Sequence, residues 1–262
     1  MIVALAAIAL YLAAAIVLGT SLNQQERNGN RSWLPLAVLA MVFHGELHAE
    51  AWRIANGPDM HFFAALSLAA LGMAALTTLM GTLGRMAALG VIVFPLSAMF
   101  ALLYRLTGNA HPMALGWQLQ LHAWSALLSY ATLAIAALLA ILLWVQERAL
   151  RRRKFHRWLR ILPPLTELET VLFRTIALGF ALLSGALLSG ALFVQDMFGQ
   201  QLAHKTVLSL LSWLVFGVLL FGRWRWGWRG NKAVRLTLVA MALLVLAFFG
   251  SQFVYDVILK QH

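Results

Sequence analysis

The chain has 262 residues, of which 62% are hydrophobic and only 11% are charged, and its mean hydropathy is +0.81. Soluble domains are about 45–50% apolar and about 25% charged, so much of this surface must face lipid rather than water. No cysteine is present, which excludes disulfides, thiolate zinc sites and iron–sulfur clusters held by this chain. The net charge of +11 would suggest nucleic acid in a soluble protein, but in a membrane protein it indicates basic loops on one side, so no nucleic-acid partner is expected.

Apolar segments of roughly 20 residues, the length that crosses the hydrocarbon core, recur along the whole chain. We therefore predict an all-α, polytopic transmembrane bundle that forms a single integral membrane domain over residues 1–262. About eight spans are expected, near residues 2–21, 35–54, 61–83, 86–106, 118–146, 171–194, 202–222 and 233–257. The first is predicted to be a span rather than a signal peptide, because no Lys or Arg precedes it and its apolar run is longer than a signal core.

The basic residues predict the orientation of these spans. With eight spans, the loops after the first, third, fifth and seventh lie on one face, and these loops with their adjoining helix ends hold 16 of the 20 basic residues. They are Arg27, Arg31, Arg85, Arg148, Arg151, Arg152, Arg153, Lys154, Arg157, Arg160, Arg174, Arg223, Arg225, Arg229, Lys232 and Arg235. Positively charged loops stay in the cytoplasm, so both termini are expected outside, as in a multi-pass protein of the bacterial inner (cytoplasmic) membrane.

Two loops are strongly basic, and the first of them has two interpretations. The run RRRKFHRWLR at residues 151–160 is typical of a helix end that continues into an interfacial turn, and it also fits a docking surface for lipid or a partner. The loop RWRWGWRGNK at residues 223–232 mixes Trp and Arg, which is typical of anchoring at the membrane surface. No loop is long enough to form a folded domain outside the membrane.

Histidines are the residues that point to chemistry. Six of the eight fall near the predicted outer surface, His44 lies near the middle of the second span, and only His156 falls on the inner side. His44 and His48 lie four residues apart on the second span and therefore share a helix face, which makes them an alternative metal-binding pair. Glu46 lies between them, but the string HGELH is not the HExxH motif of zinc proteases. An ionisable residue such as Glu46 within a span is costly and is usually paired or functional.

Two further histidines begin spans at similar depth below the outer surface. His122 begins the fifth span, and His204, followed by Lys205, begins the seventh. Imidazole is the usual axial ligand of haem iron, so His122 and His204 could hold one haem between them if they meet across the bundle. For each histidine alone, a hydrogen-bonded structural role is the simpler alternative.

Two segments, His204–Ser251 and Leu121–Leu150, resemble the YpjD-like branch of the cytochrome c assembly family. The resemblance covers most of the chain and is specific in HxxxxxxSY (His122 to Tyr130), GWRG (227–230) and FFGS (248–251). It implies a haem-handling membrane protein with eight spans and outward termini. It also implies that His122 is an outer-face haem ligand, that His44 is a histidine within the membrane, and that Lys205 follows the haem-presenting loop.

The haem-delivering members of that family carry a tryptophan-rich WGxxWxWD loop, whereas this chain has FVQDMFGQQLAH at residues 193–204. They also carry a histidine near the end of the span that follows, where this chain has Phe221 or its neighbours. Three hypotheses follow. The first is a haem-binding or haem-handling protein that acts in or beside cytochrome c maturation. The second is a cofactor-free membrane partner or regulator that kept the fold and lost the haem platform. The third is a small transporter or channel.

Few charged side chains could line a path through the membrane, and no discontinuous helix pair or inverted repeat in the sequence supports the transporter hypothesis. An enzymatic function is not expected, because no nucleophile–base pair, phosphate loop or carboxylate pair is evident in the sequence.

Overall fold

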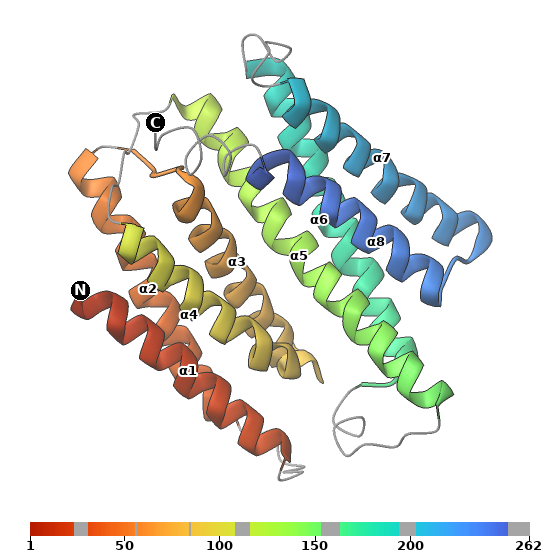
Figure 1. Ribbon diagram of the computed structural model, residues 1–262, viewed down its shortest axis with the longest axis horizontal. Helices are drawn as coiled ribbons and strands as arrows, with labels where there is room; N and C mark the ends of the chain where they lie inside the picture. The colour runs from red at the N-terminus through yellow and green to blue at the C-terminus, as the bar shows by residue number, and fades with distance from the viewer. Residues whose placement is uncertain are drawn as a thin grey trace. The chain divides into compact units, whose positions relative to one another are not determined.

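The computed structural model of the protein describes residues 1–23, 31–55, 57–83, 85–107, 116–152, 163–193 and 203–250. All regular structure in these residues is helical, and it comprises eight α-helices (Figure 1). Backbone contacts divide the chain into two compact units, unit 1 (1–114 and 155–163) and unit 2 (115–154 and 164–262). The predicted all-α class is therefore confirmed.

Unit 1 contains α1 (Ile2–Asn23), α2 (Trp33–Ala55), α3 (Phe62–Leu83), the 3₁₀ turn η1 (Arg85–Leu89) and α4 (Gly90–Thr107). Helix α1 packs against α2 and α4, and α3 packs against α4 and α2. Small residues at such contacts allow close approach, as expected where van der Waals packing drives association of helices in lipid. A Cβ atom added to Gly90 would lie 2.7 Å from Leu18 Cδ2, which shows how closely α4 approaches α1.

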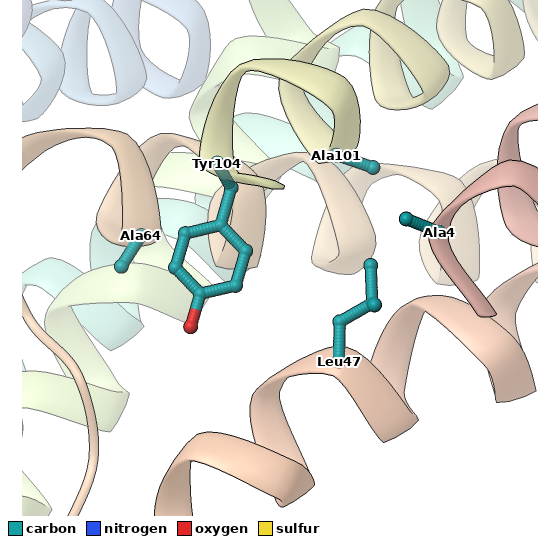
Figure 2. Close-up of a cluster of buried hydrophobic side chains, with 5 residues drawn as sticks. All are labelled: Ala4, Leu47, Ala64, Ala101 and Tyr104. Carbon is teal, nitrogen blue, oxygen red and sulfur yellow. The ribbon is translucent and has the colours of Figure 1, made fainter. Parts of the chain in front are cut away.

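All four helices of unit 1 meet in one buried cluster near an end of the unit. Figure 2 shows its side chains, which are Ala4, Leu47, Ala64, Ala101 and Tyr104. Three of the five are alanines, so the helices approach closely here and the large Tyr104 ring fills the remaining space. The hydroxyl of this tyrosine lies 3.5 Å from a carboxylate oxygen of Asp59.

Unit 2 contains α5 (Trp117–Arg151), α6 (Leu165–Phe193), α7 (Ala203–Trp226), α8 (Gly230–Val245) and the π turn η3 (Leu246–Gly250). Helix α5 packs against α6 and α8, and α7 packs against α8 and α6. Buried hydroxyls link these helices, because Tyr130 donates to the Leu244 carbonyl at 3.0 Å and Ser212 donates to the Ala240 carbonyl at 2.7 Å. A hydroxyl that bonds a carbonyl of another helix is satisfied without water, as the lipid interior requires.

Helix ends differ from the predicted spans mainly on the basic side. Helix α5 continues to Arg151 rather than ending near residue 146, and α6 begins at Leu165 rather than near residue 171. The first turn of α6 follows Pro164, whose carbonyl accepts the Leu168 amide at 3.0 Å. Proline favours a helix start, and charged residues at an interface remain helical beyond the apolar run that marks the membrane.

Seven of the described helices are long and apolar enough to cross a membrane, and α2 is the one that does not meet both conditions. Its 23 residues are enough to cross the hydrocarbon core, but two glutamates, an arginine and two histidines fall between residues 44 and 53. The eighth span and the outward termini stay predictions.

In each unit, a hydrogen bond from an arginine joins the ends of two helices. In unit 1, Arg31 donates to the Thr82 carbonyl at 3.4 Å, which brings the start of α2 beside the end of α3. In unit 2, Arg229 Nε donates to Glu169 Oε2 at 3.0 Å, which brings the α7–α8 turn beside the start of α6. Arg31 and Arg229 therefore each lie where the ends of two helices of the same unit meet.

Candidate functional site

His122 lies in the second turn of α5, where its ring faces the end of α6. Its Nδ1 lies 2.8 Å from the Ala186 carbonyl oxygen and 3.3 Å from Ser189 Oγ. A carbonyl oxygen only accepts hydrogen bonds, so Nδ1 must carry the proton. In the neutral ring, Nε2 then presents its lone pair, and no hydrogen bond to Nε2 is present within the described part of the chain.

The ring of His122 lies against Gly190 of α6. A Cβ atom added to this glycine would lie 3.0 Å from Cε1 and 3.3 Å from Nδ1 of the histidine, closer than side chains normally approach. The hydroxyl of Ser189 donates to the Ala186 carbonyl at 2.9 Å, so this carbonyl accepts hydrogen bonds from both the serine hydroxyl and His122 Nδ1. Together the residues of α6 from Ala186 to Gly190 form what we call the His122 cradle.

Lys205, at the start of α7, lies near η3, the π turn that follows α8. Its Nζ is 6.0 Å from the ring centroid of Phe248, whose ring is 5.8 Å from that of Tyr130. The neighbouring His204 is the second residue of α7, but its side chain lies outside the described residues, as do all of His111 and His262. Convergence of His122 and His204 on one haem therefore stays a prediction.

His44 is fully buried in unit 1, and both of its ring nitrogens are hydrogen-bonded. Nδ1 lies 3.2 Å from the hydroxyl of Tyr11 on α1, and Nε2 lies 2.8 Å from Ser67 Oγ on α3. His48, one turn further along α2, also contacts Ser67 Oγ through Nε2, at 3.0 Å. A serine hydroxyl has one proton, so it donates to one of these imidazoles and accepts from the other.

This hydrogen-bonded chain bears on the ligand role expected for His44. With both nitrogens occupied, His44 has no lone pair left for iron or another metal, and Ser67 occupies the position between it and His48. No group of three or more His, Cys, Asp and Glu side chains suited to a metal ion is found among the described residues. The geometry favours a role for His44 and His48 in joining α1, α2 and α3.

A second polar group lies at the end of α2 and the start of α3. The Asp59 carboxylate accepts from the backbone amide of His61 and lies 2.6 Å from His61 Nδ1, and its other oxygen lies 3.5 Å from the Tyr104 hydroxyl. The ring of Tyr104 also stacks on that of His48, with centroids 4.4 Å apart. Burial acts to raise the pKa of Asp59, but the hydrogen bonds and charge of His61, together with the electrostatic effect of His48, outweigh it and lower that pKa below its ordinary value.

Glu46 does not join the histidines on its own helix. It forms an ion pair with Arg53, and both side chains are well exposed. The structure therefore separates Glu46 from the His44–His48 face. Sequence reasoning also missed Tyr11, Ser67 and Asp59 as partners of the histidines. Tyr11 and Ser67 lie 33 and 23 residues from His44 and carry no local signal, whereas Asp59 precedes His61 by only two residues.

The family model for the cytochrome C assembly protein matches residues 36–259. The chain belongs to this family. It is 29% identical over 265 residues to the inner membrane protein YpjD of Escherichia coli (strain K12), which covers 97% of this chain and 98% of that protein. The cytochrome c biogenesis protein CcsA of Chlamydomonas reinhardtii is 29% identical over 136 residues, covering 50% of this chain and 37% of that protein. CcsA of Guillardia theta is 27% identical over 152 residues, covering 52% and 50%. No solved structure matches.

Membership of the cytochrome c assembly family confirms the resemblance seen in the sequence. The likeness to YpjD extends over nearly the whole of both chains, whereas the likeness to CcsA covers about half of this one. The expected inner-membrane location is confirmed by this full-length relative and by the seven apolar helices. Among the described histidines, His122 and His61 each donate Nδ1–H to an oxygen, the Ala186 carbonyl and the Asp59 carboxylate, and have no hydrogen bond at Nε2, whereas both nitrogens of His44 are hydrogen-bonded.

Proposed function

We propose that this protein is a haem-binding membrane protein of cytochrome c maturation and that His122 ligates the haem iron through Nε2. The observation that carries the proposal is the hydrogen bond between His122 Nδ1 and the Ala186 carbonyl. Ligating histidines almost always donate their other ring N–H to a carbonyl or carboxylate, which fixes the tautomer and leaves a basic nitrogen for the metal. His122 has this arrangement at the end of unit 2 that is predicted to face outward.

The chain's own residues would hold and orient the haem, whose iron supplies redox and ligand-binding chemistry when bound. His204, which begins α7, is the proposed source of a second imidazole. Lys205 follows it and carries an ammonium group suited to a carboxylate such as a haem propionate. The buried His44 is assigned a structural role, because Tyr11 and Ser67 take both of its nitrogens.

A second candidate function is that of a cofactor-free membrane partner. Its support is the segment at residues 193–204, which contains no tryptophan where the haem-delivering relatives carry a tryptophan-rich motif. This alternative predicts a colourless protein that copurifies with another membrane protein. It shares the fold and the membrane location with the first proposal, so the cofactor distinguishes the two.

The test is the visible absorption spectrum and pyridine haemochrome of the protein purified in detergent, before and after added haem. We expect a Soret band in the wild type that is lost in His122→Ala and retained in His44→Ala, a control that removes a histidine whose two ring nitrogens are both hydrogen-bonded. A colourless wild type even with added haem supports the cofactor-free partner. Equal spectra in the wild type and His122→Ala would refute the ligand role of His122.

A further inference from the structure

We propose that Ser189 and Gly190 are positioning residues that hold the His122 ring in one tautomer and one orientation, with Nε2 directed away from α6. The inference rests on the proposed function, because the orientation serves a ligand bound at Nε2. It adds two residues of α6 that neither the sequence motifs nor the family match assign. Two contacts of α6 with the His122 ring carry the inference, and a glycine of the same helix that makes no contact supplies the control.

The first contact fixes the tautomer. His122 Nδ1 is within hydrogen-bond distance of two oxygens, the Ala186 carbonyl at 2.8 Å and Ser189 Oγ at 3.3 Å. The Ser189 proton is used in the bond to the same Ala186 carbonyl, so its oxygen presents a lone pair to Nδ1. Both oxygens therefore accept from Nδ1–H, and the Ala186 carbonyl, which can only accept, excludes the opposite tautomer.

The second contact fixes the plane of the ring. The carbonyl of residue 186 and the Cα of residue 190 are one helical turn apart on α6, so the ring lies along the helix surface between them. Gly190 allows this approach because it lacks a side chain, and a methyl group there would meet Cε1 at 3.0 Å. The ring would have to give by a few tenths of an ångström to accommodate it.

The third observation supplies a matched control on the same helix. Gly185 lies five residues earlier on α6, and a Cβ atom added there would meet nothing within 4 Å. Replacing either glycine has the same effect on intrinsic helix propensity, which favours alanine by about 1 kcal/mol. A difference between variants at the two positions therefore reports contact with the His122 ring rather than a general effect on α6.

The experiment compares Gly190→Ala and Gly190→Val with Gly185→Ala and Gly185→Val, and adds Ser189→Ala. The first readout is the ¹⁵N spectrum of histidine-labelled, haem-free protein, in which His122 is assigned by its loss in His122→Ala. We expect the Nδ1–H tautomer in the wild type and in both Gly185 variants, and a mixture of tautomers in Gly190→Val. Ser189→Ala is expected to weaken the preference without abolishing it, because the Ala186 carbonyl remains.

The second readout is haem titration followed by the electron paramagnetic resonance spectrum, which reports axial-ligand orientation. Disturbing the contacts that orient a ligating histidine typically costs 10–100-fold in metal affinity, so we expect roughly tenfold weaker haem binding in Gly190→Val and no change in Gly185→Val. Equal tautomers and equal affinity in the Gly190 and Gly185 series would overturn the positioning role. A wild type that binds no haem would refute the proposed function. In that case the positioning of His122 is still supported if the haem-free protein has the single Nδ1–H tautomer in the wild type and loses it in Gly190→Val.

Discussion

The hydrogen-bonded chain in unit 1 predicts that Ser67→Ala destabilises the protein more than removal of a comparable buried hydroxyl. The Ser67 hydroxyl contacts Nε2 of both His44 and His48, at 2.8 and 3.0 Å, and His44 is 0% exposed. Removing the hydroxyl leaves two imidazole nitrogens without their partner. Interhelical hydrogen bonds in membrane proteins contribute on average about 0.6 and at most about 1.7 kcal/mol each, so two lost bonds predict about 1–3 kcal/mol.

Ser97→Ala is the matched control. Ser97 is also 0% exposed, lies in the same unit and donates one hydrogen bond, to the Ala70 carbonyl at 3.0 Å. A helical carbonyl keeps its own backbone bond when that hydroxyl is removed, so the expected loss is only about 0.6 kcal/mol. The free energy of unfolding is measured by titrating sodium dodecyl sulfate into the purified protein in mixed micelles. Equal losses in Ser67→Ala and Ser97→Ala would refute the idea that both histidines depend on Ser67.

Three further predictions concern the turn between α7 and α8 and the end of unit 1. Gly222→Ala would bring a Cβ atom into overlap with the Trp228 ring, so we expect a loss of about 1–3 kcal/mol in the same titration. Glu169→Gln weakens the bonds to Arg229 and to the first amide of α8, and a loss of about 1 kcal/mol is expected. The lowered pKa of Asp59 means that its stabilising effect is present above the unfolded-state pKa of about 3.9 and is lost as pH falls through the lower folded-state pKa. Thermal unfolding at decreasing pH should therefore show a loss of stability that Asp59→Asn lacks.

Each of these predictions has its own comparison. Gly217→Ala places a Cβ atom 3.5 Å from Phe180, an ordinary contact, and should be close to neutral. Glu147→Gln removes an ion pair with the 75%-exposed Arg151, so its effect should be smaller than that of Glu169→Gln. If Gly222→Ala is as stable as Gly217→Ala, close packing of Gly222 against Trp228 does not contribute to stability. If Glu169→Gln is as stable as Glu147→Gln, the bonds of Glu169 contribute no more than an exposed ion pair. An unchanged acid profile in Asp59→Asn would contradict the assignment of that transition to Asp59.

Most of the fold could be predicted because the bilayer imposes a length and a composition on each helix. Apolar runs predicted the existence of the eight helices, and seven of them satisfy both conditions in the structure. Helix ends at the interface could not be predicted from hydropathy, since Glu147 and Arg151 continue α5 as an ion-paired helical turn beyond the apolar run. The division of backbone contacts into two units was also not predicted, because hydropathy carries no information on which helices pack together.

The site could be predicted only in part. His122 was found from its position at the start of a span and from the family motif, but the cradle on α6 depends on a carbonyl 64 residues away, which no local pattern encodes. His44 was expected to be available as a ligand, and the structure instead satisfies both of its nitrogens with Tyr11 and Ser67. Glu46 was weighed with the histidines because it is near them in sequence. On the helix it lies on another face and pairs with Arg53.

The most direct test of the central claim is the haem spectrum of His122→Gly with and without added imidazole. The account predicts that this variant loses the Soret band of the wild type and that free imidazole, which can enter the space left by the side chain, restores it. Glycine removes the ligand but leaves the cradle on α6 in place, so rescue separates ligation from folding. A His122→Gly protein that keeps the wild-type spectrum without imidazole would contradict ligation of haem by His122.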